Sequence, residues 1–344
     1  MRQPSGAPKR DDEKAVSEIM GVTMLLAMVI TTMAGVVVVM QPFMQDLNDN
    51  REWTSASVAA NQFNDRLLIA AEAPEGSGLV VSSVHLAEII QPVRLSEIWK
   101  ISADLSGDDR VTADISSGRV SINSVNGTAA EVRITTTLGQ ENGSLQNGQG
   151  QLSITLDLTG WILVDVFNSE GDIIYRWIQV PLDGIRLSTP LTGGDFTIDL
   201  INGARVQQLP NKPVDIFGYP RLDHDLTLNG EYRVSLVLLD TDMVGTGFAD
   251  DASLELISEG QITFFSDEAR NVRIETDFTS EDGRATKYRQ EWTDDYDLHR
   301  STGELENYVG FGPYGRISGV EGMTMHPTYA TISLDVLLQQ VVVK

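Results

Sequence analysis

The fold is decided by the stretch Lys14-Ala-Val-Ser-Glu-Ile-Met-Gly-Val-Thr-Met-Leu-Leu-Ala-Met-Val-Ile-Thr-Thr-Met-Ala-Gly-Val-Val-Val-Val-Met40. No charged residue occurs between Glu18 and Asp46. A helix over Ile19–Met40 would be about 33 Å long, which matches the hydrocarbon core of a bilayer. The apolar run exceeds the roughly 7–15 residues of a cleaved secretory signal. The sequence therefore predicts a membrane-spanning helix that is kept in the mature protein.

The basic residues before this helix predict its orientation. Arg2, Lys9, Arg10 and Lys14 precede the apolar run, and basic residues flanking a membrane helix are retained on the cytoplasmic side. We therefore expect a single-pass cell-membrane protein with a cytoplasmic N-terminus and an extracellular C-terminal bulk.

The junction Lys14-Ala15-Val16-Ser17-Glu18-Ile19-Met20-Gly21-Val22, followed by an uninterrupted apolar helix, resembles the class III signal peptide and N-terminal helix of archaeal type IV pilins and archaellins. The resemblance covers about 30 of the 344 residues. It implies that a prepilin peptidase cuts beside Ala15, most favourably after it. Residues 1–15 would then be a removed leader and Val16 the new N-terminus. It also implies that the helix assembles with other pilin subunits, identical or different, in a surface filament.

The sequence departs from the pilin pattern in two respects. The leader is long and carries Asp11, Asp12 and Glu13 beside the cleavage site. Glu18 also lies closer to the new terminus than the corresponding carboxylate does in bacterial pilins. Both departures bear on the exact cleavage position.

Glu18 has two interpretations. In the first, Ser17 caps the helix and Glu18 complements the positive end of the helix dipole at the membrane interface. In the second, Glu18 lies among apolar helices and pairs with the freed amino group of a neighbouring subunit, since a lone buried carboxylate would cost several kcal/mol. Gly21 belongs to a set of small residues that would let neighbouring helices approach closely.

The helical region is expected to continue to residue 73, so that residues 16–73 form a transmembrane and stalk helix. Pro42 should kink or interrupt it locally. Beyond Pro42 an apolar stripe indicates a helix face that packs on the protein's own head; it consists of Trp53, Ala56, Ala60, Phe63, Leu67 and Ala71. The run Pro74-Glu-Gly-Ser-Gly78 should end the helix.

From Leu79 onward the apolar residues recur with a period of two, which indicates β-strands. Examples are Val120 with Ile122, Val132 with Ile134, Thr136 and Leu138, Leu152 with Ile154, Leu156 and Leu158, Tyr232 with Val234, Leu236 and Leu238, and Val272 with Ile274. Turn signals such as Asn126-Gly127, Asn142-Gly143 and Asn202-Gly203 separate them. The predicted fold class is α+β, with a large, mainly antiparallel, sandwich-like head. The Pro-rich patch from Pro210 to Pro220 suggests a division of the head into residues 79–210 and 211–344, although a long loop within one domain would look the same.

Composition narrows the function by exclusion. The net charge is −24 and the chain has no cysteine. An acidic chain without a basic stripe does not bind phosphates well, so no nucleic-acid partner is predicted. The absence of cysteine excludes disulfides, thiol catalysis and Cys-ligated zinc.

Two triplets match the N-glycosylation acceptor pattern: Asn126-Gly-Thr128 and Asn142-Gly-Ser144. The densest group of hard ligands, Asp294, Asp295, Asp297 and His299, is interpreted as a solvated acidic loop rather than a cation site. No catalytic constellation, metal site or cofactor site is predicted, and we expect the protein not to be an enzyme.

We therefore expect a pilin-like filament subunit, minor or specialised because its head is large. The alternative is a membrane-anchored extracellular binding protein that does not polymerise.

Overall fold

The computed structural model describes residues 10–82, 87–107, 109–116, 118–153, 160–218, 220–226, 232–245, 253–279, 283–284, 287, 309–312, 320–325 and 331–344. The chain divides into two compact units, Met1–Thr54 and Ser55–Lys344. The first unit holds the apolar part of the N-terminal helix. The second unit, called the head below, holds the last turns of that helix and all the strands.

Helix α1 spans Arg10–Glu72 and contains Pro42. Of the two effects expected of Pro42, the interruption is wrong, because the loss of one backbone hydrogen bond is not enough to end the helix. The local kink stays a prediction. The predicted stop after residue 73 is confirmed. The N–H of Ala73 donates to the carbonyl of Ala70 at 3.1 Å, and Gly76 adopts φ +77°, a left-handed conformation that suits glycine.

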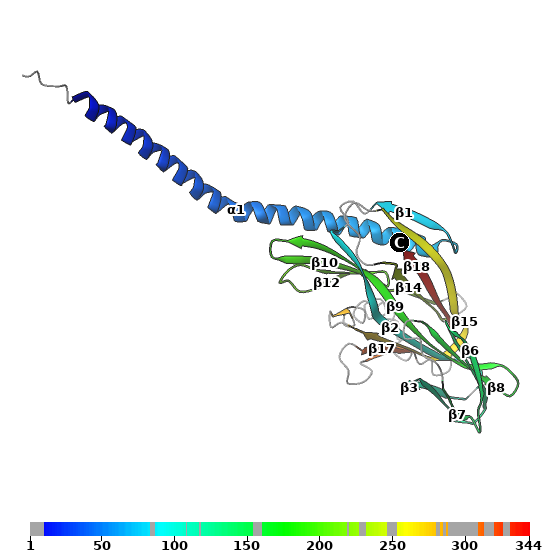
Figure 1. Ribbon diagram of the computed structural model, residues 1–344. Coiled ribbons are helices and arrows are strands. Elements are labelled where there is room, and N and C mark those ends of the chain that lie inside the picture. The colour runs from blue at the N-terminus through cyan, green and yellow to red at the C-terminus, as the bar shows by residue number, and fades with distance from the viewer. Residues whose placement is uncertain are drawn as a thin grey trace, which may run out of the picture. The chain divides into compact units, whose positions relative to one another are not determined.

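The α+β prediction is confirmed, since α1 is followed by a head built of strands (Figure 1). The strands are β1 (Gly78–Ser82), β2 (Ile89–Asp104), β3 (Val111–Ser116), β4 (Arg119–Ser124), β5 (Ala129–Thr136), β6 (Gly139–Ser144), β7 (Gln149–Ser153), β8 (Ile162–Asn168), β9 (Ile173–Leu191), β10 (Gly194–Ile201), β11 (Ala204–Gln208), β12 (Asp215–Phe217), β13 (Arg221–Leu226), β14 (Tyr232–Met243), β15 (Ser253–Phe278), β16 (Val309–Gly312), β17 (Val320–Met325) and β18 (Ile332–Val343). Among the described strands only the pair β14–β18 is parallel. The main path of the large sheet is β12-β11-β10-β9-β2-β15-β18-β14-β13.

Strand β15 belongs to both layers of the main core. Its first part pairs with β1 and β18, and its last part pairs with β2 and β17. Between the two parts, Asn271 adopts φ +51° and the pairing with β2 shifts register from Arg270 to Arg273. This bulge turns the strand, so that β14 and β18 face β9 and β2 across a shared apolar core.

A second, smaller core lies in the part of the head between residues 106 and 178. The three-stranded sheet β3-β4-β7 covers it on one side, and β5, β8 and the first half of β9 cover it on the other. The boundary suggested at residue 210 does not separate two sheets, because strands from both sides of it pair in the large sheet, as β2 does with β15. The segment after Pro210 leads to β12, which pairs with β11.

Most of the predicted alternation is confirmed. The apolar residues of β4, β5, β14 and β15 that were expected on one face are buried; they are Val120, Ile122, Val132, Ile134, Val234, Leu236, Leu238, Val272 and Ile274. Leu138 is exposed because it lies in the turn between β5 and β6, where Thr136 pairs with Gly139. Residues 154–159, which include Ile154, Leu156 and Leu158 of the predicted alternation, lie outside the described residues.

Of two predicted turns, one is confirmed and the other is wrong, because strand pairing places its residues within a strand. Asn202-Gly203 is a two-residue hairpin with both residues at positive φ, as the sequence predicts. Asn142-Gly143 is not a turn: both residues lie within β6, where Asn142 pairs with Arg133 and Gly143 with Val132. A Cβ on Gly143 would lie 3.0 Å from a methyl group of Leu152. This glycine therefore serves close packing between strands rather than chain reversal.

Candidate functional site

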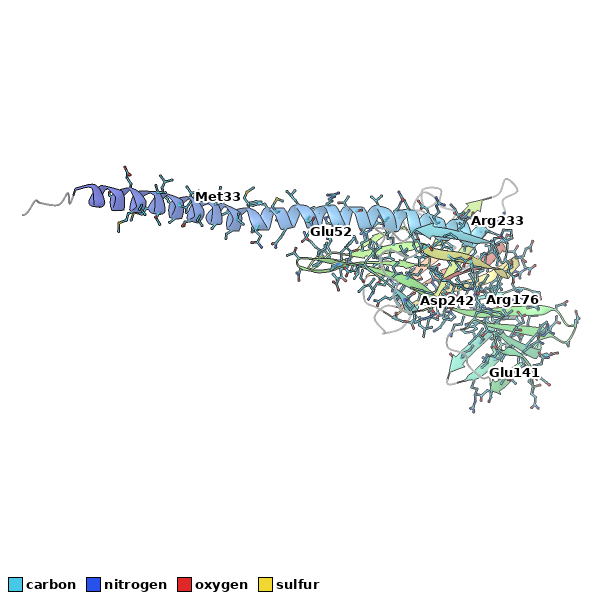
Figure 2. All side chains as sticks on the ribbon, turned by 45° about the horizontal axis from the view of Figure 1, so that its top comes forward. Met33, Glu52, Glu141, Arg176, Arg233 and Asp242 are labelled. Atoms are coloured by element: carbon cyan, nitrogen blue, oxygen red, sulfur yellow. The ribbon has the colours of Figure 1, made fainter. Side chains whose placement is uncertain are left out.

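The first candidate site is the surface of α1 between Ile19 and Met44. Its large apolar side chains are exposed on every side of the helix, and Met33, for example, is 67% exposed (Figure 2). The most apolar 18-residue window of this helix is 0% buried within the protein. An apolar surface of this length requires lipid or other helices around it. The helix is long and apolar enough to span a membrane.

The polar atoms within this segment are satisfied inside the helix. The hydroxyls of Thr23, Thr31 and Thr32 each donate to the carbonyl four residues earlier, at 2.7 Å. A threonine hydroxyl bonded in this way does not need water. The threonines therefore do not prevent the segment from lying in an apolar environment.

The predicted processing residues (Lys14, Ala15 and Val16) and the predicted assembly residue Glu18 lie near the start of α1. Lys14, Ala15 and Val16 are in the helical backbone of α1, and their side chains lie outside the described part of the chain. Glu18 is exposed on the helix surface. Because α1 begins at Arg10, Ser17 is inside the helix and does not cap it in the full-length chain. The capping interpretation of Ser17 is therefore wrong for this form and would apply only after the leader had been removed.

Within the described residues, Gly21 packs against no other part of the chain. A Cβ added at Gly21 would meet nothing within 4 Å, and the same holds for Gly35. Glycine inside a helix costs about 1 kcal/mol relative to alanine. These glycines leave flat places on the helix surface, to which a neighbouring helix backbone can come close.

The last turns of α1 are packed on the head. The buried side of these turns consists of Ala56, Ala60, Phe63, Leu67, Ala70 and Ala71. Five of these were predicted from the stripe; Trp53 is only half-buried and Ala70 was not predicted. The small alanines let the helix backbone approach the strands, and Phe63 fills the remaining space at 1% exposure.

Hydrogen bonds from β11 and β15 fix the same turns. Arg205 Nη1 donates to the Ser57 carbonyl at 3.3 Å and to Asn61 Oδ1 at 3.1 Å. Gln207 Nε2 donates to Ser57 Oγ at 3.0 Å, and Ser258 Oγ donates to the Ala73 carbonyl at 2.9 Å. The sequence pattern identified the helix face but not these partners on the strands.

The two sequons are both exposed but differ in their surroundings. Asn126 precedes a turn held by Asp109, whose carboxylate accepts hydrogen bonds from the N–H of Asn126 at 2.8 Å and of Thr128 at 3.1 Å. Burial alone would raise the pKa of Asp109, but the hydrogen bonds from Ser124, Thr128 and Asn126 outweigh it and lower the pKa to about 2. Asn142 lies on β6, which pairs only with β5 among the described strands.

Asp240 occupies a cluster of charges formed by the inner parts of β2 and β9 and the end of β14. Arg94 Nη1 pairs with Asp183 Oδ2 at 2.5 Å and also with Asp242. Burial, with the charges of Asp183 and Asp242, raises the pKa of Asp240 to about 6, although the N–H of Asp183 donates to its carboxylate at 2.9 Å. The folded protein therefore holds a proton on Asp240 in a pH range where the unfolded chain has lost it.

This shift predicts a pH dependence of stability. As pH rises from about 4 through about 6, the free energy of unfolding should fall by about 1–3 kcal/mol from this group, because the charged form is disfavoured only in the folded state. Thermal unfolding of the full chain at a series of pH values measures it. Asp240→Asn should flatten the profile in this range. An identical pH profile for the two proteins would contradict the prediction.

No family model, curated protein or solved structure matches the chain. The described residues contain no group of three or more His, Cys, Asp or Glu side chains placed to hold a metal ion. The cluster from Asp294 to His299 lies outside the described residues.

Proposed function

We propose that this chain is a type IV pilin-like subunit of a surface filament, in a minor or specialised position. The observation that carries the proposal is the fully exposed apolar surface of α1, in a helix whose last turns are locked to a folded head. Lipid can cover that surface before assembly, and the helices of other subunits can cover it in a filament. The packed last turns would join the apolar part of the helix to the head that it displays.

In this proposal the predicted processing and assembly residues act one after another. A prepilin peptidase cuts after Ala15 and frees the amino group of Val16. The cut places Ser17 and Glu18 in the first turn of the mature helix, where Glu18 can pair with the amino group of the next subunit in apolar surroundings. Gly21 and Gly35 allow close helix contacts. The basic residues of the leader hold the N-terminus in the cytoplasm, so that the head is extracellular.

The alternative is a single-pass anchored protein that stays monomeric and binds a partner through its head. It uses the same exposed helix, with lipid as its permanent partner. The two proposals differ at the N-terminus: a simple anchor needs no cleavage and no new amino group.

The N-terminal sequence of the mature protein tests the proposal. Mass spectrometry of the protein purified from membranes and from sheared surface material should find a start at Val16 or Ala15. An intact Met1 in both fractions would support the simple anchor and contradict the filament proposal. A start beyond Met33 would contradict both, because too little of the apolar segment would remain to span a bilayer.

Glu18→Ala should reduce the protein in the sheared filament fraction by at least about tenfold, because the buried amino group of the neighbouring subunit would lose its partner. The amount of protein in the membrane fraction should not fall. Immunoblots of the two fractions measure the effect.

Asp46→Ala is the matched control, because it removes a carboxylate from the same helix beyond the apolar segment. It should leave both fractions unchanged. Normal filaments formed by Glu18→Ala, with normal membrane insertion, would show that Glu18 has no role in assembly.

A further inference from the structure

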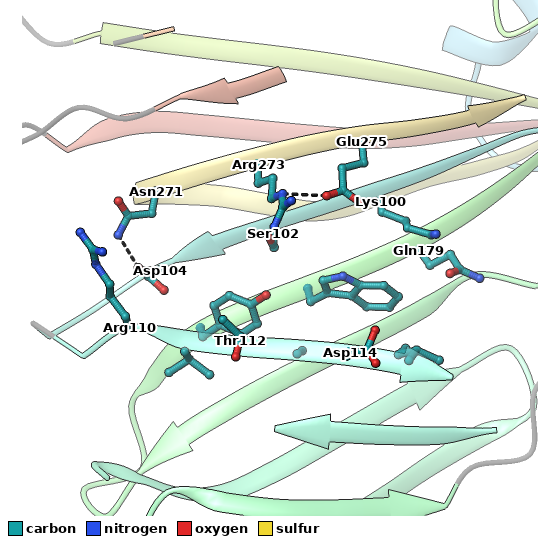
Figure 3. Close-up of a pocket in the computed structure, with 15 residues that line it drawn as sticks. Lys100, Ser102, Asp104, Arg110, Thr112, Asp114, Gln179, Asn271, Arg273 and Glu275 are labelled. Atoms are coloured by element: carbon teal, nitrogen blue, oxygen red, sulfur yellow. Dashed lines mark hydrogen bonds and ion pairs between the residues drawn. The ribbon is translucent and has the colours of Figure 1, made fainter. Parts of the chain in front are cut away.

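A groove of about 640 Å³ lies on the head between the edge of the three-stranded sheet and the outer face of the large sheet (Figure 3). Its floor is formed by β2, β9 and β15, and its wall by β3. The volume is in the range of pockets that hold small ligands. The groove is independent of the apolar helix surface on which the filament proposal rests.

Strand alternation produces the floor. Residues of one parity in β9, β2 and β15 point into the main core, among them Ile178, Ile101 and Ile274. The alternate residues point into the groove, where pairing places Lys100 between Gln179 and Glu275, and Ser102 between Trp177 and Arg273. The result is a grid of polar side chains on three adjacent strands. Trp177 and Tyr175 belong to the second core and are only 8% and 6% exposed, so they contribute little accessible aromatic surface to the groove.

The charges of the groove balance, although the whole chain carries −24. The lining contains the cations Lys100, Arg110 and Arg273 and the anions Asp104, Asp114 and Glu275. Some of these groups are already paired: Asn271 Nδ2 donates to Asp104 Oδ2 at 2.6 Å, and Arg273 Nε contacts Glu275 Oε1 at 2.7 Å (Figure 3).

Other side chains that line the groove have donors or acceptors that no protein group uses within the described part of the chain. Within the described part of the chain, no hydrogen bond or ion pair engages the side chains of Lys100, Asp114 or Gln179. Together they present an ammonium group, a carboxylate and an amide around one groove. Such a mixture can donate to and accept from the same ligand.

The equal number of cations and anions, and the backbone hydrogen bonds already made at the edge of β3, exclude two classes of ligand. A phosphate or sulfate polymer needs an excess of cations, which this groove lacks. An extended peptide would add to a free strand edge, but the Asp104 carboxylate and the Tyr175 hydroxyl already bond to the backbone of Val111 and Ala113 on β3. The three floor strands are internal to the sheet where they line the groove and offer no free edge.

We propose that this groove binds a neutral oligosaccharide. Lys100 can donate to its hydroxyl groups, Asp114 can accept from them, and the amide of Gln179 can do both. A neutral polyhydroxylated ligand needs the balanced mixture of donors and acceptors that the lining offers.

The test uses the full chain in detergent micelles and an array of neutral, uronic-acid and sulfated oligosaccharides, with calorimetric titration of the best neutral binder. Lys100→Ala/Gln179→Ala should weaken its binding by at least about tenfold, because two polar contacts are lost. Gln179→Ala alone should weaken it by a smaller factor and serves if the double variant does not fold. Circular dichroism and thermal unfolding confirm the fold of each variant.

Lys212→Ala/Gln140→Ala is the matched control, because it removes the same side-chain types from exposed positions outside the groove. It should bind as the parent chain does. Three results would overturn the proposal: no neutral oligosaccharide bound at about 10 mM, binding of acidic glycans only, or equal binding by the parent chain and the groove variants.

Discussion

Phe63→Ala is expected to lower the free energy of unfolding of the head by about 3–5 kcal/mol. Phe63 is 1% exposed and lies on the buried side of the last turns of α1, between Ala60 and Leu67. Alanine would leave a cavity that the alanine-lined side of the helix cannot fill. Denaturant titration of the full chain, followed by tryptophan fluorescence, measures the loss.

Ile69→Ala is the control for Phe63→Ala. Ile69 lies on the same turns of α1 but is 56% exposed, so its replacement should change stability by no more than about 0.5 kcal/mol. Equal effects of the two substitutions would show that the helix does not pack on the head as described. The filament proposal would then lose the packed contact between the last turns of α1 and the strands.

Glu97→Ala is expected to cost a similar amount, about 3–5 kcal/mol, because it leaves a buried guanidinium without its counter-ion. Glu97 is 0% exposed and Arg284 is 1% exposed, and they are 3.2 Å apart. The Glu97 carboxylate also accepts hydrogen bonds from Trp99 Nε1 at 2.8 Å and from Asn202 Nδ2 at 3.1 Å. Its removal therefore disturbs β2, the hairpin at Asn202 and the position of Arg284 together.

Two further variants make this prediction specific. Asp223→Ala breaks an exposed pair with Arg221, in which both side chains are at least 60% exposed, and should cost no more than about 1 kcal/mol. Glu97→Met/Arg284→Met removes both buried charges and should be more stable than Glu97→Ala alone. A double variant no more stable than Glu97→Ala would contradict the assignment of the loss to the unpaired charge. Thermal unfolding of the three variants beside the parent chain decides the matter.

The sequence predicted those features that depend on neighbouring residues in the chain. The charge-free stretch after Glu18 predicted an apolar helix of membrane length, and Pro74 with Gly76 predicted its end. The spacing of Ala56, Ala60 and Phe63 predicted the face that packs on the head. In each case a local period or a backbone preference is sufficient, because helix and strand geometry repeat over a few residues.

Prediction failed where distant residues decide the outcome. Asn142-Gly143 has the composition of a tight turn, but pairing with β5 and the packing of Leu152 place it within a strand. Pro210 marks a local break in periodicity, yet strands on both sides of it pair in one sheet. The sequence did not predict the groove. Lys100, Ser102 and Gln179 alternate with buried residues, but alternation shows only that one face of a strand is more polar, not which distant strand lies over that face.

By itself, then, the sequence determined an apolar helix, its packed last turns and a β-rich head, since each follows from local periodicity. Only the tertiary structure decided that β15 turns from one layer to the other at Asn271, that Glu97 meets Arg284 within the core, and that three strands and the edge of β3 enclose a balanced polar groove. These features join residues far apart in the chain, and no local pattern encodes which distant strand will be the neighbour.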